Sequence, residues 1–89
     1  MEIYKGTTGL NKTWQSPFKK DKECPYCKGN ARIMFVACEG YEDKGNFITD
    51  LHENTGGDKN GKYWVHDACA VAVYLCEKCF EVCGDINQA

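Results

Sequence analysis

Apolar residues along the chain gather in two segments with the character of β-strands. Residues 31–38 (ARIMFVAC) are rich in strand-forming types and follow a turn of Lys, Gly and Asn at 28–30. In residues 71–76 (VAVYLC), Val, Val and Leu alternate with Ala, Tyr and Cys, and this period of two favours a second strand. Alanines at 68, 70 and 72 instead favour a short helix over part of this segment, with Asp67 as its N-cap. Together the two segments predict a mainly-β core.

Polar, glycine-containing stretches separate the apolar ones. Residues 39–46 predict a hairpin connection, and residues 47–52 (FITDLH) predict the returning strand. Residues 54–62 (NTGGDKNGK) give the strongest loop signal in the chain, and we expect an exposed loop there. Residues 80–82 (FEV) predict a further short strand.

Residues 1–22 have no sustained hydrophobic period. Their glycines, Pro17 and scattered polar residues predict an irregular arm rather than a helix. The arm still carries five large apolar groups, too many for a disordered tail: Ile3, Tyr4, Leu10, Trp14 and Phe18. We therefore expect an irregular arm, residues 1–22, that packs on a domain formed by residues 23–89.

The length and the cysteine content change this picture. A domain of 89 residues has a hydrophobic core that is marginal by itself, and seven cysteines can supplement it as disulfides or as metal ligands. No apolar run has the length of a signal peptide or of a membrane span, which predicts a cytoplasmic protein with reduced thiols. That compartment and the odd number of cysteines both favour metal over disulfides.

Four of the cysteines form two Cys-x-x-Cys pairs, Cys24 with Cys27 and Cys76 with Cys79, each next to a predicted strand. Two intervening residues let one tight turn, a knuckle, direct both sulfurs at the same point. Two knuckles supply the four ligands that a tetrahedral Zn²⁺ binds at about 2.3 Å. The sequence therefore predicts one Zn²⁺ per chain. Four reduced core thiols are the alternative, which explains the mostly polar or turn-forming residues between the cysteines poorly.

This arrangement of knuckles and strands resembles the zinc-ribbon group of small metal-binding domains. The resemblance covers residues 23–83 and is carried by Cys24, Pro25, Cys27 and Gly29 in the first knuckle and by Cys76 and Cys79 in the second. It implies an antiparallel sheet of three strands with the knuckles side by side. Residues 28–75 separate the two pairs, against about 15–20 residues in the compact pattern, so the chain should contain an inserted hairpin.

Iron is the alternative to zinc, because tetrahedral sulfur sites suit either metal. Rubredoxin-like proteins hold iron in two similar knuckles and transfer electrons. Glycine typically follows the second cysteine of those knuckles, whereas Lys28 follows Cys27 here. We therefore favour zinc.

A second metal site is an alternative use of the remaining ligand residues. His66 and Cys69 have ligand spacing, and with Cys38 and either Cys83 or His52 they make a set of four. The segment from Trp64 resembles the His-x-x-Cys element of cross-braced fingers of the PHD type. Cys38 has no cysteine partner two to four residues on, so we expect Cys38 and Cys69 to be buried thiols.

Catalysis has little support in the sequence. Cys69 as a nucleophile, His66 as its base and Asp67 as an orienting carboxylate come together only if the backbone turns there. Neither an oxyanion device nor a substrate pocket can be named. We expect a protein that is not an enzyme.

The charge pattern bears on the partner. The net charge is −2 and the pI is about 5.6, which disfavours non-specific nucleic-acid binding. A basic cluster near the first knuckle is the one candidate nucleic-acid contact: Lys19, Lys20, Lys22, Lys28 and Arg32. The leading hypothesis is a structural-zinc module that binds a protein partner. A nucleic-acid-binding ribbon and a rubredoxin-like electron carrier are the alternatives.

Overall fold

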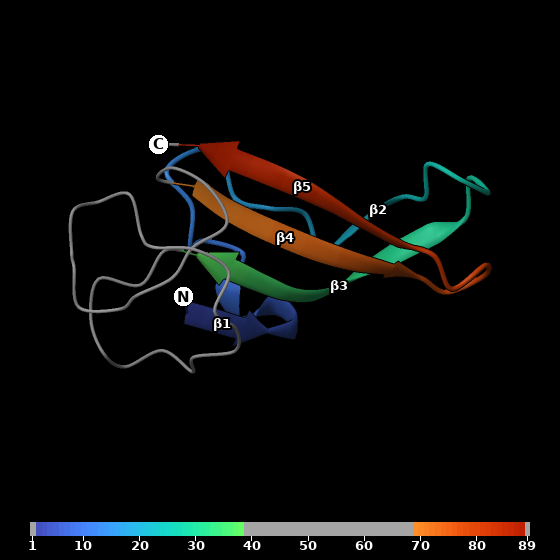
Figure 1. The fold of residues 1–89 in the computed structure, drawn as a ribbon, viewed down its shortest axis with the longest axis horizontal. Helices are drawn as coiled ribbons and strands as arrows, with labels where there is room; N and C mark the ends of the chain where they lie inside the picture. The colour runs from blue at the N-terminus through green and yellow to red at the C-terminus, as the bar shows by residue number, and fades with distance from the viewer. Residues whose placement is uncertain (1, 39–68, 89) are drawn as a thin grey trace, which may run out of the picture.

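The computed structural model describes residues 2–38 and 69–88. These residues form a five-stranded antiparallel sheet (Figure 1). The strand order is β1-β3-β4-β5, and β2 pairs with β3 as well. Both knuckles lie at one end of the sheet and both chain termini at the other. The elements are β1 (Glu2–Lys5), a 3₁₀ turn η1 (Gly6–Gly9), β2 (Asp21–Glu23), β3 (Asn30–Cys38), β4 (Cys69–Cys76) and β5 (Val82–Gln88).

The two central strands are those that the hydrophobic pattern predicts. β3 covers the predicted 31–38 with one more residue, and β4 extends the predicted 71–76 back to Cys69. The helix suggested by the alanines does not form from residue 69 onwards, because these residues pair with both β3 and β5. A residue with a hydrogen-bonded neighbour on each side gains more from the ladder than from alanine's helix propensity.

The alternation along β4 separates a covered face of the sheet from an outer face. Every second side chain from Ala70 to Cys76 is fully buried, whereas Val71, Val73 and Leu75 between them are half-buried. Two of the buried residues are alanines, and Tyr74 and Val36 are the bulkiest side chains that are fully buried. Small residues on this face let another segment of chain lie directly on the strand.

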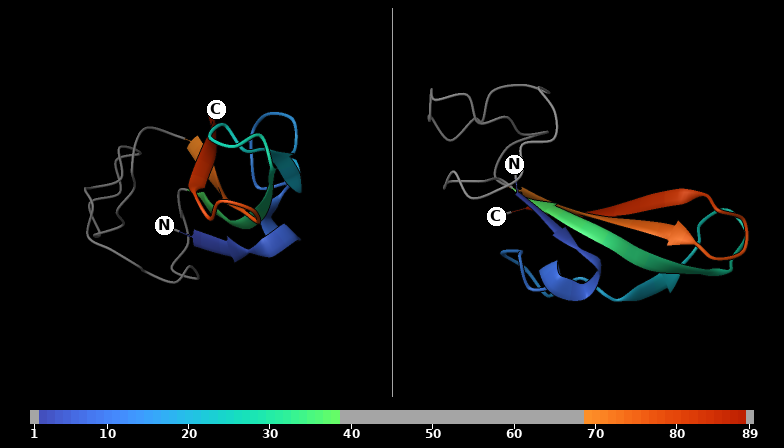
Figure 2. Two further views of the ribbon diagram at one scale, coloured as in Figure 1. Left: turned by 90° about the vertical axis from the view of Figure 1, so that its right-hand side faces the viewer. Right: turned by 90° about the horizontal axis from the view of Figure 1, so that it is seen from below.

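That segment is the N-terminal arm, which lies along the covered face (Figure 2). Phe18 is buried there, and the Tyr74 hydroxyl donates a 2.7 Å hydrogen bond to the Lys19 carbonyl. A Cβ atom on Gly9 would lie 2.5 Å from the Tyr4 Cβ and 2.9 Å from the Val36 Cβ, so the close approach requires glycine. The predicted irregular segment contains two short strands, β1 and β2, which pair with opposite halves of β3. The division into arm and domain stays a prediction.

β5 is longer than the sequence predicts and begins at Val82, the last residue of the predicted 80–82 strand. Its polar side chains on the covered face bind the arm and β2. Asp85 pairs with Lys22, and the Asn87 amide donates to the Thr13 hydroxyl at 2.9 Å. The Gln15 side chain donates to the Gln88 carbonyl at 3.0 Å. These bonds explain a strand with little apolar character.

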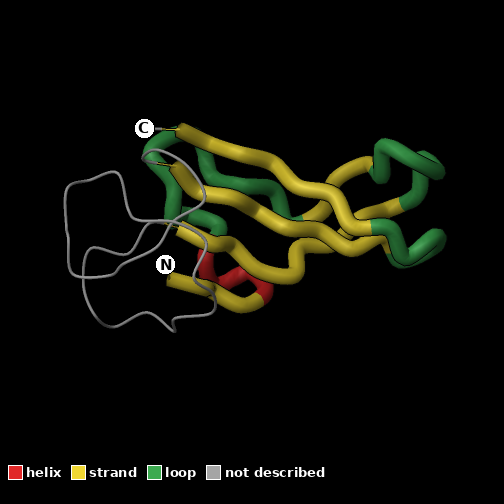
Figure 3. The backbone as a smooth tube through the Cα atoms, viewed as in Figure 1, coloured by secondary structure: helices red, strands yellow, loops and turns green. Residues whose placement is uncertain are grey.

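The fold-class prediction of a small, mainly-β antiparallel sheet with two knuckles is confirmed (Figure 3). The predicted hairpin at 39–52 and the predicted loop at 54–62 lie outside the described residues. Within the described ranges, no helix is long and apolar enough to cross a membrane.

Candidate metal centre

The two knuckles have the same backbone geometry. The first joins β2 to β3, and in it the Cys24 N–H donates to the Gly29 carbonyl at 2.8 Å while the Lys28 N–H donates to the Cys24 carbonyl at 3.0 Å. The second joins β4 to β5. There the Cys76 N–H donates to the Glu81 carbonyl at 2.9 Å and the Phe80 N–H donates to the Cys76 carbonyl at 3.1 Å. Each turn therefore closes by two backbone hydrogen bonds that start and end at its first cysteine.

Each knuckle also needs one residue in the left-handed region of backbone conformation. Lys28 has a φ of 66° and Phe80 a φ of 61°, and each directly follows the second cysteine of its pair. These are the described non-glycine residues with positive φ. Glycine adopts this conformation without strain, whereas a bulky side chain does so at a cost. Both turns therefore adopt the left-handed conformation without glycine, the residue that adopts it most easily.

The two knuckles also contact each other through residues other than their cysteines. The Glu77 N–H in the second knuckle donates to the Asn30 carbonyl after the first, at 3.0 Å. A Cβ atom on Gly29 would lie 3.2 Å from both the Cys27 Sγ and the Lys78 Cβ. Glycine at position 29 therefore allows the two turns to approach closely enough for their sulfurs to cluster.

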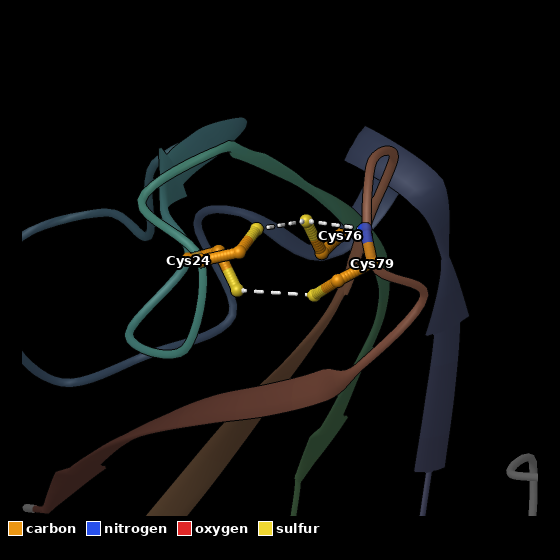
Figure 4. Close-up of side chains that lie close together, drawn as sticks. Cys24, Cys76 and Cys79 are labelled. Atoms are coloured by element: carbon orange, nitrogen blue, oxygen red, sulfur yellow. Dashed lines mark hydrogen bonds between the residues drawn. The ribbon is translucent and has the colours of Figure 1, made fainter.

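The four sulfur atoms form a tight cluster at the end of the sheet (Figure 4). All four lie within 4.8 Å of one another. Cys24 Sγ is 3.7 Å from Cys79 Sγ, and Cys27 Sγ is 3.5 Å from Cys76 Sγ. Four sulfurs at about 2.3 Å from a tetrahedral metal are separated by about 3.8 Å, whereas a disulfide requires about 2.05 Å. The four cysteines are therefore placed where they could hold a metal ion, and none of them is joined in a disulfide.

Burial and backbone donors prepare the sulfurs for a cation. Cys24 and Cys76 are fully buried, and Cys27 and Cys79 are partly exposed. The Gly29 N–H donates to Cys27 Sγ at 3.4 Å. The N–H groups of Lys78 and Cys79 both donate to Cys76 Sγ at 3.4 Å. Such donors stabilise a thiolate because they bring positive dipole ends to the sulfur.

Without metal, the pKa values of two of the thiols, Cys76 and Cys79, shift in opposite directions. Hydrogen bonds from the backbone of Cys79 and Lys78 lower the pKa of Cys76 to about 6, against the opposing effect of burial. For Cys79, the N–H of Glu81 lowers the pKa, but burial and the neighbouring thiols outweigh it and raise the pKa to about 12. Four adjacent sulfurs cannot all ionise unless a cation balances them. The donor set therefore fits a divalent metal with soft-ligand preference, and it suits zinc and iron alike.

Of the residues suggested for a second site, Cys83 lies apart from Cys38 and Cys69 in the described part of the chain, and the site itself stays a prediction. Cys38 at the end of β3 pairs with Ala70, while Cys83 on β5 pairs with Tyr74, four residues further along β4. Cys69 is buried beside Ala37 in a separate small cluster. His52 and His66 lie outside the described residues, as does Asp67 of the alternative catalytic group. In the described ranges, the four knuckle cysteines are the one group arranged to hold a metal.

The basic cluster is partly balanced by acids. Lys22 pairs with Asp85, and its ammonium group also lies 5.5 Å from the centre of the Tyr74 ring. The Arg32 guanidinium lies 3.4 Å from Glu77 and 3.6 Å from Asp21. These acids reduce the positive field of two of the five basic residues. Lys19, Lys20 and Lys28 have no ion pair within the described residues.

Sequence reasoning named the four cysteines that cluster but missed the backbone groups that contact their sulfurs. The donors to sulfur are backbone N–H groups of Gly29, Lys78 and Cys79, so residue type gives no signal for them. The repeated left-handed residue after each Cys-x-x-Cys pair carries no signal either, because neither position is glycine.

Comparisons with models of known protein families, with curated proteins and with solved structures gave no match for this chain.

Proposed function

We propose that the protein is a structural-zinc module of zinc-ribbon type that mediates a protein interaction and has no catalytic activity of its own. Cys24, Cys27, Cys76 and Cys79 would hold one Zn²⁺. The ion would supply binding energy that fixes the two knuckles, and thereby the ends of four strands, in one arrangement. We place the module in the cytoplasm, where thiols stay reduced.

One observation carries the proposal: two knuckles distant in sequence bring four sulfurs to within 4.8 Å of one another, and two of the sulfur–sulfur distances are 3.7 and 3.5 Å, close to the value in a tetrahedral site. The protein-binding role has separate support in large apolar side chains that are exposed to solvent. Near the knuckles they include Tyr26 and Phe80, and on the β5 edge Val82 and Ile86. Val82 and Ile86 lie on one face of β5, and apolar groups exposed on one face are typical of surfaces that bind another protein.

Metal analysis tests the proposal directly. Protein made without added metal should contain one equivalent of zinc, and X-ray absorption should give four sulfur neighbours at about 2.3 Å. One equivalent of iron with a reversible redox couple would favour the rubredoxin-like electron carrier instead. Two tightly bound zinc ions, one of them lost on His66→Ala, would establish the second site.

A nucleic-acid-binding ribbon is the second candidate, supported by Lys19, Lys20 and Lys28, which have no acidic partner among the described residues. If they contact phosphates together with Lys22 and Arg32, affinity for a single strand should fall with salt at a log-log slope of about −3. We expect weak binding or none at about 0.15 M salt. Submicromolar binding there, abolished by Lys20→Glu with Lys22→Glu, would favour this candidate.

A further inference from the structure

Among the described residues, β5 is a long strand at the edge of the sheet, and its inward-pointing charge, Asp85, is paired with Lys22. It runs from Val82 to Gln88, and its register with β4 is continuous, with no bulge. It contains neither lysine nor proline. Natural proteins protect exposed edges with such features or cover them, because unpaired N–H and C=O groups recruit another strand.

The backbone groups of β5 that point away from β4 can be assigned from the register. The Cys76 N–H bonds to the Glu81 carbonyl, which fixes these two residues as a hydrogen-bonded pair. An antiparallel ladder alternates, so the odd-numbered residues of β5 face β4 and the even-numbered residues face outwards. The bond from Gln15 to the Gln88 carbonyl agrees with this assignment. In the described chain, Val82, Gly84 and Ile86 have no such partner on the outer side.

The side chains on this edge are apolar on the outer face of the sheet. Ile86 is 62% exposed and Val82 is 52% exposed. They neighbour Val71 and Leu75 of β4, which are half-buried on the same face. A strand added at β5 would therefore extend an apolar surface that already exists.

We infer that β5 pairs antiparallel with β5 of a second copy of this chain, with the two-fold axis at Gly84. This register sets Val82 opposite Ile86 of the other copy, twice by symmetry, and its backbone hydrogen bonds use only residues whose N–H and C=O groups face outwards. It sets Cys83 opposite Asp85 of the other copy. Shifting the centre to Asp85 would place two carboxylates opposite each other, which disfavours that register.

The arm leaves room for this pairing and offers charge complementarity. A cleft of about 490 Å³ separates residues 16–19 from Asp85, Ile86 and Asn87, and Lys19 and Lys22 line it. In the register centred on Gly84, Glu81 of the second copy falls opposite Asn87, next to these two lysines. The dimer names a partner for the protein-binding role proposed above, but it does not depend on which metal occupies the knuckles.

The test measures the oligomeric state of the metal-loaded full chain by sedimentation and its amide exchange by NMR. One strand pair makes a small interface, so we expect a weak dimer whose population rises with protein concentration. The amides of Val82, Gly84 and Ile86 should become protected as the concentration rises. A monomer at all concentrations up to about 0.5 mM, or a dimer in which these amides exchange rapidly, would overturn the inference.

A charge-swap pair tests the register. Val82→Lys with Ile86→Lys places like charges opposite each other and should weaken the dimer by about tenfold or more. Val82→Glu with Ile86→Lys places opposite charges there and should restore it at low salt. Met34→Lys, at an exposed position of β3 away from this edge, is the matched control and should leave the dimer unchanged. Metal content, measured first, shows that each variant folds. Equal dimerisation of the two double variants would contradict the register.

Discussion

At the scale of single residues, the knuckles carry local strain that a bound metal would compensate. Lys28 and Phe80 adopt left-handed backbone conformations that favour glycine. Phe80 is also 72% exposed, so packing of its side chain does not offset the backbone strain. The free energy of metal binding, on the order of 10 kcal/mol, exceeds a cost of about 1–2 kcal/mol per strained residue.

We expect Lys28→Gly and Phe80→Gly each to raise the free energy of unfolding of the metal-loaded protein by about 0.5–1 kcal/mol, because glycine removes the left-handed strain. Denaturant unfolding followed by circular dichroism measures this. Phe80→Ala is the control, since alanine keeps a Cβ atom and should give no such gain. A loss of stability in both glycine variants would show that these side chains make contacts that outweigh the strain.

Cys38 should react slowly with alkylating agents. Burial, and after it the neighbouring Glu2 carboxylate, raises the pKa of Cys38 to about 11 from 9.0. At pH 8 the thiolate fraction is then about 100-fold lower, and alkylation should slow by a similar factor relative to the unfolded chain. Because the folded state holds the proton more tightly, this stabilisation is present below pH 9 and is lost as the pH rises through about 11. Rapid modification of Cys38 in the folded protein, located by mass spectrometry, would contradict its burial.

At the scale of elements, the sequence predicts the strands that contain their own apolar pattern and misses those that depend on a neighbour. β3 and β4 follow from runs of strand-forming residues. β1 and β2 are only a few residues long and exist because β3 offers them a hydrogen-bonding edge. β5 contains glycine, aspartate and asparagine, which suggest a turn, but β4 pairs with all of it and the arm binds its polar side chains. Tertiary pairing outweighs local propensity in each case.

The attachment of the arm to β4 can be tested at one hydrogen bond. Tyr74 is fully buried and donates to the Lys19 carbonyl, so Tyr74→Phe leaves that carbonyl without its donor. We expect a loss of about 1–2 kcal/mol in the free energy of unfolding. Tyr26→Phe is the matched control, because the Tyr26 side chain is largely exposed, and it should change stability little. Equal effects of the two substitutions would show that the Tyr74 hydrogen bond does not hold the arm.

At the scale of the whole molecule, the cysteine cluster brings together two turns that are distant in the sequence. The first knuckle links β2 to β3 and the second links β4 to β5, so one bound ion would fix the ends of four strands. The cluster of four cysteines could be predicted because Cys-x-x-Cys spacing constrains the turn itself. The choice between zinc and iron could not, since both metals accept four thiolates and the donors that tune the site are backbone N–H groups.

Removal of the metal should therefore unfold the protein. We expect Cys27→Ser to lose the metal and the cooperative thermal transition, because the binding energy, on the order of 10 kcal/mol, is largely folding energy. Cys83→Ser is the matched control, since Cys83 lies outside the cluster. Acid should act in the same direction. Protons compete with the metal for the four thiolates, so the stabilisation by the metal should be lost as the pH falls. Metal release to a chromophoric chelator, with circular dichroism melts between pH 7 and 4, measures both effects. Full metal content and an unchanged melting temperature in Cys27→Ser would show that the four cysteines are not the ligands.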